Sequence, residues 1–399
     1  MILNKNSSEY VKNKEYKKMN LVYRLFVLCG VIFLVVMYFS DEISAKKLQM
    51  QYSFFIDDYK KYANKKLGFD SVFLDEVFKN SSGIYGLYKQ VETKRKNDIL
   101  NANNIDILLN ADIVKKGQEF IKNHIEELQM IEKKYKVDSS ILVAFLGLQS
   151  LYCSLNKEDF SDINNNINSF DEISVLGTLA LGGEYSDEFK KELDEYIGLL
   201  KNNNVNLDQL GDAEGRFSCL GFSPAEYSRY GVDENLDGIV DLSKNYMDIL
   251  ASASNYLIKM GWQDYNSWGF VVSLPMNVDD VSENLQLINF KKIGFKQYNG
   301  DSLPDSKDVY TLINTNFNGR LALLVNSNFY NLVGDGKSLS YTVSLAFLSK
   351  ELNDFIKYYK ALNYSKKIDE KDKRINTVEP VKEELYRNYY KKRKINDAK

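Results

Sequence analysis

The chain contains 399 residues, of which 44% are hydrophobic, so it can form a sizeable core in one multi-lobed unit or in two to three domains. Its 52 Lys and Arg residues nearly balance 55 Asp and Glu residues, which leaves a formal net charge of −3. This balance argues against nucleic acid as a partner, because phosphate binding needs a basic surface and no basic-aromatic motif is present.

A basic leader, residues 1–20, precedes an uncharged apolar run, Leu25–Phe39. Positive charge before an apolar run places the N-terminus in the cytoplasm and directs the following chain across the membrane. Residues 21–40 together approach the length of about 20 residues that a transmembrane anchor needs, with Arg24 reaching to the interface. The shorter apolar core also fits a cleaved signal sequence, so both alternatives remain open.

Between Leu48 and Asn204 the sequence predicts amphipathic helices separated by polar turns. The predicted helices are Tyr52–Leu67, Gln118–Lys136, Ser139–Cys153, Ile173–Leu181 and Phe189–Leu200. The third has apolar residues on more than one face, as expected of a helix that is buried on several sides, and Asp138, Ser139 or Ser140 can cap its N-terminus. The lone histidine, His124, lies on the second helix, where we expect a surface or packing role.

One polar side chain, Gln149, lies deep in the apolar run of the third helix. A buried amide must find hydrogen-bond partners, because leaving it unpaired costs about 1–3 kcal/mol. One interpretation is therefore a core amide whose hydrogen bonds join two helices. The alternative is a residue of a functional site, and the motifs downstream decide between the two.

A loop rich in Asp follows at residues 233–241, with the spacing D-x-N-x-D-G-x-V-D. This spacing places oxygen ligands as in a calcium-binding loop, with Gly238 at the sharp turn. Lys244 occupies the position where an EF-hand has its last Glu, which excludes a standard EF-hand. The predicted ligands of a structural Ca²⁺ are Asp233, Asn235, Asp237, Asp241 and, from further on, Asp248. The alternative is an Asx-rich turn without metal.

The C-terminal half combines helices with short strands. We expect helices over Ile249–Met260 and Ser344–Leu362, and strands over Phe270–Leu274, Tyr310–Ile313, Leu321–Val325 and Phe329–Val333. A charged tail, residues 363–399, follows. The predicted fold class is mainly α (α+β), a helical core with a small β-containing subdomain in one domain over residues 48–362.

The order of the motifs resembles membrane-bound lytic murein transglycosylase B and its relatives, periplasmic enzymes with a lysozyme-like fold that cleave the glycan strands of peptidoglycan. The family motif G-[VL]-E-[ST]-x-[YW]-G corresponds to Gly147–Cys153, GLQSLYC. A second motif, G-A-M-G-x-x-Q-F-M-P-S, corresponds to Gly215–Ala225. The resemblance extends from about Phe54 to Leu352 and includes the Asp-rich loop.

The resemblance implies that Gln149 stands where the family has a Glu that first protonates the glycosidic oxygen and then acts as base. The family reaction closes the muramyl 6-hydroxyl onto the anomeric carbon and gives a 1,6-anhydro sugar. An amide has no titratable proton, so a general acid-base contribution of about 10²–10⁴-fold is removed. Gln149 and its neighbour Ser150 are therefore the residues at the catalytic position, and no organic cofactor is implied.

Other family positions also differ, since the motif Gln falls at Gly221 and a late Asn falls at Gly336. The residues that still match predict a sugar-binding surface, and they are Tyr152, Phe222, Tyr256, Ser338 and Tyr341. If the chain retains cleavage activity, Glu214 in the same loop is the nearest candidate for a replacement acid. The resemblance also places Cys153 and Cys219 beside the cleft, where they form either a disulfide or two free buried thiols.

We therefore expect a protein on the periplasmic side of the inner membrane, anchored by residues 21–40 or released after cleavage. The expected function is binding of peptidoglycan glycan strands by a lytic-transglycosylase-like protein, a pseudoenzyme whose cleavage activity is lost or reduced. The alternative is an active lytic murein transglycosylase. Cell-wall synthesis proteins are further expected partners.

Overall fold

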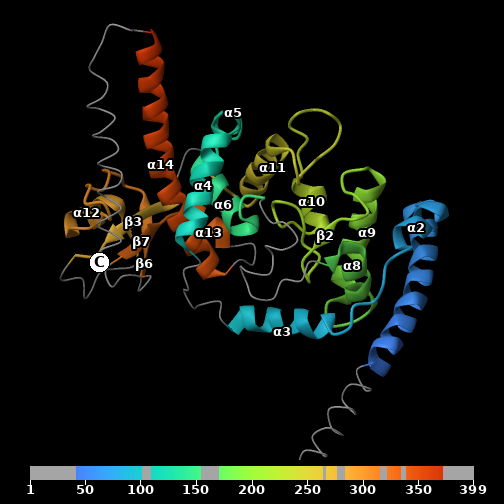
Figure 1. Ribbon diagram of the computed structural model, residues 1–399. Helices are drawn as coiled ribbons and strands as arrows, with labels where there is room; N and C mark the ends of the chain where they lie inside the picture. The colour runs from blue at the N-terminus through green and yellow to red at the C-terminus, as the bar shows by residue number, and fades with distance from the viewer. Residues whose placement is uncertain are drawn as a thin grey trace, which may run out of the picture. The chain divides into compact units, whose positions relative to one another are not determined.

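The computed structural model describes residues 42–100, 109–153, 170–263, 267–275, 284–314, 321–333 and 338–371 (Figure 1). The predicted membrane segment 21–40, Gly336 and the tail from residue 372 on lie outside these residues. Within the described ranges, no helix has the length and apolar character needed to cross a membrane. The chain divides into two compact units, the first formed by residues up to 88 with 173–190, the second by 89–172 with 191 onward.

The first unit contains a long helix over residues 42–62, which continues into a π-helical turn, η1 (Ala63–Leu67). Gly68 ends it in the left-handed conformation, with φ 76°, and the Asp70 carboxylate caps the next helix, α2 (Ser71–Phe78). The ring of Tyr52 packs directly on Gly177 of α8 (Glu172–Leu181). The predicted helices Tyr52–Leu67 and Ile173–Leu181 are confirmed.

The second unit is built around α6 (Ser139–Ser150), which packs against α4 (Ala111–Asn123), α5 (Ile125–Tyr135), α11 (Tyr246–Lys259) and α14 (Leu339–Lys371) (Figure 1). Every residue of α6 from Ser139 to Gly147 is buried, because neighbours surround the helix on several sides. The Asp138 carboxylate caps it by accepting the Ser140 N–H at 2.7 Å. The prediction of a buried helix is confirmed, with Asp138 as the cap.

Further helices of this unit are α3 (Leu87–Leu100), which begins in the first unit, α9 (Ser186–Lys201), which crosses from one unit to the other, and α10 (Pro224–Tyr230). Ser223 and Glu226 form a reciprocal capping box at the start of α10. The predicted helix Phe189–Leu200 corresponds to α9, and Ile249–Met260 corresponds to the greater part of α11.

The prediction of a single helix over Gln118–Lys136 is wrong, because the chain breaks at His124 between α4 and α5. His124 leaves helical geometry with φ −126° and ψ 28°, and its ring packs between Phe120 and Tyr246 at centroid distances of 4.6 and 4.0 Å. Apolar spacing continues through the break, so periodicity alone could not locate it. The packing role expected for His124 is observed.

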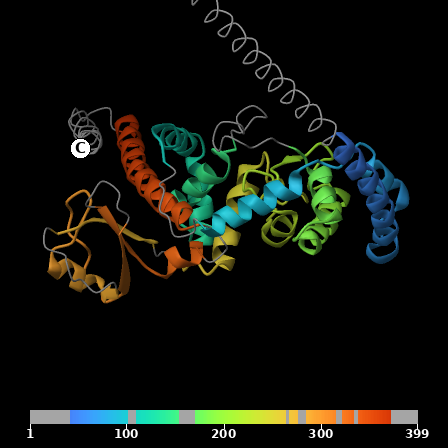
Figure 2. The same ribbon diagram turned by 90° about the horizontal axis from the view of Figure 1, so that it is seen from below.

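The small subdomain is a five-stranded antiparallel sheet with the order β4-β6-β7-β3-β5. Its strands are β3 (Gly269–Ser273), β4 (Asn284–Gln286), β5 (Lys296–Gln297), β6 (Val309–Asn314) and β7 (Leu321–Val325). In the centre, Val271 pairs with Leu323 and Val272 with Ala322. On one face, α12 (Leu287–Ile293) covers an apolar core that contains Val272, Phe290 and Leu324 (Figure 2).

The predicted strand Phe329–Val333 is instead part of a helix, α13 (Ser327–Val333). The Asn326 side chain accepts the Asn328 N–H at 3.0 Å, a local contact that favours a helical start over an extended chain. A short apolar run does not distinguish a strand from a buried helix. The sequence also gave no sign of the two-residue strands β1 (Phe170–Asp171) and β2 (Leu210–Gly211), which pair with each other.

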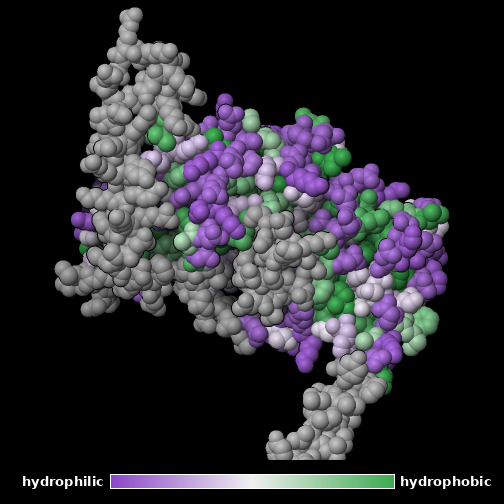
Figure 3. Space-filling model, in the orientation of Figure 1, coloured by the Kyte–Doolittle hydropathy of each residue, from purple (hydrophilic) through white to green (hydrophobic). Residues whose placement is uncertain are grey.

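On the face seen in Figure 3, hydrophilic and hydrophobic side chains of the described residues are interspersed. The mainly α fold with a small sheet that the sequence predicts is thus the observed architecture. The helices that pack around α6 determine where its C-terminal end lies.

Two glycines of different environments test the packing of α6. A Cβ on Gly147 would lie 2.5 Å from the Tyr152 hydroxyl oxygen, whereas a Cβ on Gly198 of α9 would meet nothing within 4 Å. Gly147→Ala is therefore expected to lower the free energy of unfolding by about 1–3 kcal/mol through overpacking. Gly198→Ala, the control, is expected to be neutral or stabilising by up to about 1 kcal/mol. Urea unfolding of both variants measures this, and equal stability would contradict it.

Candidate functional site

The end of α6 is a three-residue left-handed turn. Leu151, Tyr152 and Cys153 have φ values of 47°, 63° and 61°, a conformation that costs non-glycine residues about 1–2 kcal/mol each. Backbone N–H groups of Leu151 and Tyr152 donate to carbonyls of the last helical turn, and the Cys153 N–H donates to Ser150 Oγ at 3.1 Å. Ser150, predicted at the catalytic position, is buried and fixes this turn.

Gln149 lies in the last turn of α6 and is half-buried. Its amide makes no hydrogen bond to any residue that the structure describes, so a core amide joining two helices is not supported. A Cβ on Gly221 would lie 3.3 Å from Gln149 Oε1, which shows that the backbone of Gly221 directly faces the amide. The two family positions that differ most in chemistry are therefore neighbours in space.

Gly221 belongs to a tight loop between β2 and α10. The loop is closed by a bridge in which the Phe217 N–H donates to the Phe222 carbonyl at 3.0 Å, and Gly221 itself is left-handed with φ 58°. The guanidinium of Arg216 donates to Glu226 at 2.9 Å and to the Gly221 carbonyl at 3.4 Å. Backbone and side-chain contacts thus fix the segment that faces Gln149.

Cys153 and Cys219 are joined by a disulfide, with their Cα atoms 4.8 Å apart. The bond links the turn after Gln149 to the loop that carries Gly221. The Cys219 N–H also donates to the Leu242 carbonyl at 3.0 Å, which ties the same loop to the segment before α11. We call the turn after Gln149 and the loop that carries Gly221 the two walls of the site. The disulfide holds these two walls together, and the hydrogen bond fixes the second wall to the segment before α11.

Tyr152 has a structural role. Its side chain is 5% exposed, its hydroxyl donates to the Ile113 carbonyl of α4 at 2.8 Å, and its ring lies in a slot lined by Gly117 and Gly147. The sugar contact of Tyr152 stays a prediction, and in this structure the side chain packs α4 against α6. This packing is possible because α4 and α6 approach closely where glycines leave room for the ring.

Phe222 and Tyr256, also predicted to bind sugar, are buried in the wall behind the site. The two rings lie 5.5 Å apart and contact Tyr230 at 6.0 and 5.2 Å respectively, while Phe145 of α6 packs on Tyr256 at 5.5 Å. Such an aromatic cluster stabilises the wall by burial and ring contacts. It supports the site from behind rather than presenting an open sugar-binding surface.

Ser338 and Tyr341 lie at the start of α14, and the Ser338 hydroxyl accepts the Tyr341 N–H at 3.1 Å. Burial raises the pKa of the Tyr341 hydroxyl far above its usual range. Ser338 therefore acts as a helix cap in this structure. No described contact brings either residue to Gln149.

Glu214 forms ion pairs with Lys94 and with Arg95 of α3, the latter at 3.0 Å. Burial alone would raise the pKa of Glu214, but Lys94 and Arg95 outweigh this effect and hold the pKa below its usual value. At neutral pH Glu214 is thus ionised and lacks the proton that a replacement acid must donate. The ion pairs therefore argue against Glu214 as the replacement acid that the sequence suggested.

Glu172, unlike Glu214, has no cationic partner within the described chain. The sequence showed only an acidic residue in the first turn of a helix and did not indicate that this side chain is buried. Its side chain is fully buried, and neither carboxyl oxygen has a hydrogen-bond partner within the described chain. It packs against Gly211, where any Cβ would clash with Glu172 Oε2. Burial, reinforced by Asp212 and Asp171, raises the pKa of Glu172 well above its usual value.

The Asp-rich loop is ordered by hydrogen bonds from its own amides. Asp233 accepts the N–H groups of Asp237 and Gly238, and Asn235 Oδ1 also accepts the Asp237 N–H. Asp241 accepts the N–H groups of Ser243 and Lys244, and Gly238 takes the left-handed turn with φ 90°. Gly238 thus takes the sharp turn that a calcium loop has at this position, and side-chain oxygens of the loop are engaged by its own amides.

Asp248, the most distant predicted ligand, is fully buried and accepts the N–H groups of Glu234, Asn235 and Asp241. Glu234 is fixed in turn by Tyr135 and Lys134 of α5, at 2.6 and 2.7 Å. Over the ranges described, no three His, Cys, Asp or Glu side chains are grouped as metal ligands. The donors of the loop fit a cation only in part, and Asp248 serves to anchor the loop.

The profile of the Transglycosylase SLT domain matches residues 53–350 of the chain. Among solved structures, the chain is similar to Pseudomonas aeruginosa SltB3 in complex with NAG-NAM-pentapeptide, with a TM-score of 0.62, 23% identity, and coverage of 76% of this chain and 79% of that one. No curated protein matches the chain significantly.

The chain is also similar to the soluble lytic transglycosylase SltB1 of Pseudomonas aeruginosa, with a TM-score of 0.58, 18% identity, and coverage of 74% and 97%. Escherichia coli Slt35 in complex with calcium gives a TM-score of 0.57, 18% identity, and coverage of 76% and 92%. At these low identities the likenesses establish a shared fold.

The environment of Glu172 predicts a pH-dependent stability. The pKa of Glu172 is higher in the folded than in the unfolded protein. Its contribution to the free energy of unfolding is therefore fully present below the ordinary carboxyl pKa, and it is lost as the pH rises toward the folded pKa. Glu172→Gln keeps the shape without the ionisation. Between these two pKa values, the free energy of unfolding of the variant should rise relative to that of the wild type by up to about 1.4 kcal/mol per pH unit. Urea unfolding between pH 4 and pH 8 measures this, and parallel pH profiles would contradict it.

Proposed function

The chain belongs to the SLT transglycosylase domain family, and we propose that it binds the glycan strands of peptidoglycan but cleaves them far more slowly than an active lytic transglycosylase. The proposal rests above all on Gln149. The resemblance of Gly147–Cys153 to the family motif assigns this residue to the position of the acid and base, and the structure has it at the half-buried end of α6 opposite Gly221. An amide there can hold a substrate oxygen by a hydrogen bond but can neither donate nor accept the proton that the reaction transfers.

Two carboxyl groups that the sequence or the structure singles out do not meet the requirements of a replacement. Glu214 is ionised by its ion pairs with Lys94 and Arg95. Glu172 holds its proton but is 0% exposed, so substrate cannot reach it in this conformation. Glu214 therefore lacks the proton that the reaction needs, and Glu172 lacks access to the substrate.

The persistence of the site walls supports binding. The disulfide, the aromatic cluster of Phe222 and Tyr256, and the turn after Gln149 preserve a built site although the acid is gone. A relative with the same fold, SltB3, is known in complex with NAG-NAM-pentapeptide. We extend glycan binding from that relative to this chain as a proposal.

The alternative function is an active lytic transglycosylase that forms 1,6-anhydro products. It would need proton transfer through a group other than Gln149, Glu214 and Glu172. We further propose that residues 21–40 hold the protein at the periplasmic side of the inner membrane, where cell-wall synthesis proteins are candidate partners.

We also propose that the Asp-rich loop binds calcium through Asp233, Asn235, Asp237 and Asp241. Slt35, which is known in complex with calcium, shares the fold.

The full-length protein in detergent, incubated with purified murein, tests the main proposal. We expect the wild type to sediment with murein and to release no 1,6-anhydro muropeptides detectable by mass spectrometry. Gln149→Glu restores the carboxyl group, but Gly221 still lacks the side chain that the family motif has at this position, so we expect partial activity at most. Gln149→Ala is the control, because it removes the amide without introducing a carboxyl group. Anhydro products from the wild type, or full activity from Gln149→Glu alone, would overturn the proposal.

The calcium proposal has a separate test. A ligand that binds only the folded state stabilises it by about 1.4 kcal/mol at ten times its Kd. We therefore expect millimolar CaCl₂ to raise the unfolding midpoint relative to EDTA, and Asp237→Asn to reduce that shift. Asp305→Asn, which changes an exposed acid outside the loop, is the control. An unchanged midpoint in calcium would exclude the site.

A further inference from the structure

The disulfide between Cys153 and Cys219 includes a residue whose backbone conformation is unfavourable. Cys153 is left-handed, with φ 61°, a conformation that a residue other than glycine adopts about 5- to 30-fold less readily than a right-handed one. The family motif ends in Gly where this chain has Cys153, and Gly takes the left-handed conformation without this penalty. In this chain a covalent bond therefore supports a conformation that glycine would adopt by itself.

The two halves of the disulfide are held differently. Cys219 has anchors besides the bond, because its N–H donates to the Leu242 carbonyl at 3.0 Å and its Sγ lies 3.5 Å from the Ser243 carbonyl oxygen. The side chain of Cys153 is held by the bond to Cys219, and its N–H donates to Ser150 Oγ. Breaking the disulfide therefore frees the side chain of Cys153 and leaves Cys219 in place.

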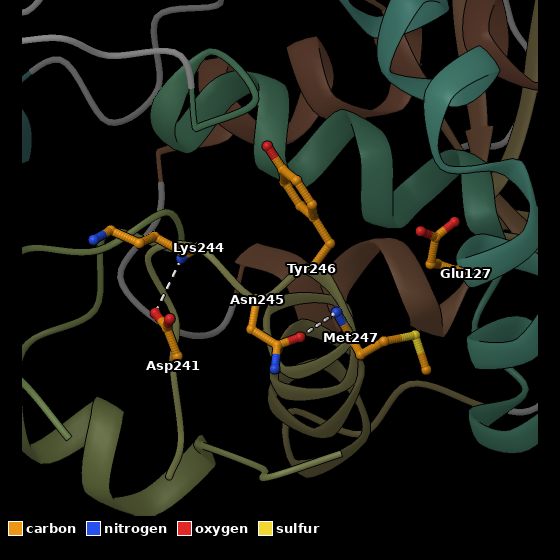
Figure 4. A pocket seen from close by; sticks show the side chains of 6 residues that line it. All are labelled: Glu127, Asp241, Lys244, Asn245, Tyr246 and Met247. Carbon is orange, nitrogen blue, oxygen red and sulfur yellow. Dashed lines mark hydrogen bonds between the residues drawn. The ribbon is translucent and has the colours of Figure 1, made fainter. Parts of the chain in front are cut away.

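The segment that anchors Cys219 is ordered by its own hydrogen bonds. Asp241 accepts the Lys244 N–H at 3.0 Å, which closes a turn around the two carbonyls that face Cys219 (Figure 4). Asn245 accepts the Met247 N–H at 3.1 Å and caps α11, as the second dashed line in Figure 4 shows. These contacts do not involve the disulfide, so they fix the position of Cys219 in both of its redox states.

The two cysteines also differ in their access to solvent. Cys153 is half-buried, whereas Cys219 is 5% exposed. A disulfide is opened by a thiolate that attacks one of its sulfurs, and the sulfur that can be approached is the one attacked. An incoming thiolate therefore reaches Sγ of Cys153, and Cys219 is the leaving group.

We propose that this disulfide is a site of thiol–disulfide exchange with a dithiol, and that its reduction releases the turn after Gln149 and weakens the binding of glycan strands. A thiolate of the dithiol attacks Sγ of Cys153, and the bond to Cys219 breaks. The Cys219 thiolate takes up a proton, and the resulting thiol donates a hydrogen bond to the Ser243 carbonyl. The second thiolate of the dithiol then attacks the first sulfur of the same dithiol and releases Cys153. Two electrons pass from the dithiol, which becomes a disulfide, to the two cysteines.

The consequence for glycan strands rests on the proposed function. Gln149 lies four residues before Cys153, and Gly221, two residues after Cys219, faces its amide. The disulfide thus holds the two walls of the site in register on either side of Gln149. Once the bond is broken, the preference of Cys153 for other conformations draws the turn away from the second wall. We expect the oxidised protein to bind glycan strands about 5- to 30-fold more tightly than the reduced protein.

A first test follows the bond in the full-length protein in detergent. Dithiothreitol is added under native conditions, thiols are trapped with iodoacetamide in urea, and alkylated cysteines are counted by mass spectrometry. The chain has three cysteines, so the count should rise from one to three. The monothiol glutathione should form its mixed disulfide on Cys153. Reduction that occurs only under denaturing conditions, or a mixed disulfide on Cys219, would overturn the inference.

A second test measures the release of the turn without any ligand. Hydrogen exchange is followed at the N–H groups of Leu151, Tyr152 and Cys153, which are hydrogen-bonded in this structure. Reduction is expected to speed their exchange by about 5- to 30-fold, while the amides of residues 143–147 in the buried part of α6 stay protected. Equal exchange of the turn in both redox states, or loss of protection throughout α6, would refute a local release.

A third test compares murein binding by the oxidised and the reduced wild type with two double variants that lack the bond. Cys153→Ser with Cys219→Ser keeps a side chain at the left-handed position, whereas Cys153→Gly with Cys219→Ser removes it. The Gly variant should bind murein about 5- to 30-fold more tightly than the Ser variant, and dithiothreitol should change neither. Equal binding by the two variants would contradict the role assigned to the left-handed residue.

These measurements separate the inference from the proposed function. Murein binding that is equal in the oxidised and the reduced wild type would overturn the inference and leave glycan binding intact. Failure of both redox states to bind murein would refute the proposed function, and the effect on glycan strands would be refuted with it. Hydrogen exchange then decides by itself whether reduction releases the turn.

Discussion

The packing of Tyr152 between α4 and α6 determines the geometry of the candidate site. Its ring fills a slot that exists only because Gly117 and Gly147 have no side chains, and its hydroxyl bonds to the backbone of α4. This contact stabilises three successive left-handed residues that would otherwise be unfavourable. The end of α6, and with it Gln149, is therefore placed by a buried interaction that is independent of any chemistry at the site.

This independence means that the fold does not depend on which polar side chain stands at position 149. The residues that build the walls are buried and bonded among themselves, so substitution at Gln149 or Gly221 does not disturb them. The charged groups nearby are committed to other contacts, with Glu214 paired to α3 and Glu226 paired to Arg216. The framework of the site thus rests on buried contacts, and Gln149 at its edge carries no titratable group.

The sequence predicted the buried helix, its cap and most of the sheet, because these depend on local patterns of apolar and capping residues. It did not predict the break at His124 or the helical state of Ser327–Val333, where side-chain packing and an Asn contact override the pattern. Family matching led to Gln149, whose role stays a prediction, and to Cys153, which forms the disulfide that was one of its two expected states. The sugar contacts that it assigned to Tyr152 and Phe222 also stay predictions, because motif identity does not reveal whether a side chain points to the site or to the core.

The disulfide between Cys153 and Cys219 joins positions 66 residues apart in the chain. In the chain-entropy description, a closed loop of this length lowers the conformational freedom of the unfolded chain by the equivalent of about 4 kcal/mol at room temperature. It also changes the effect of proteolysis. A single cut anywhere between the two cysteines leaves both fragments covalently connected at the site, so the wall formed by α6 and its facing loop would survive a nick until the bond is reduced.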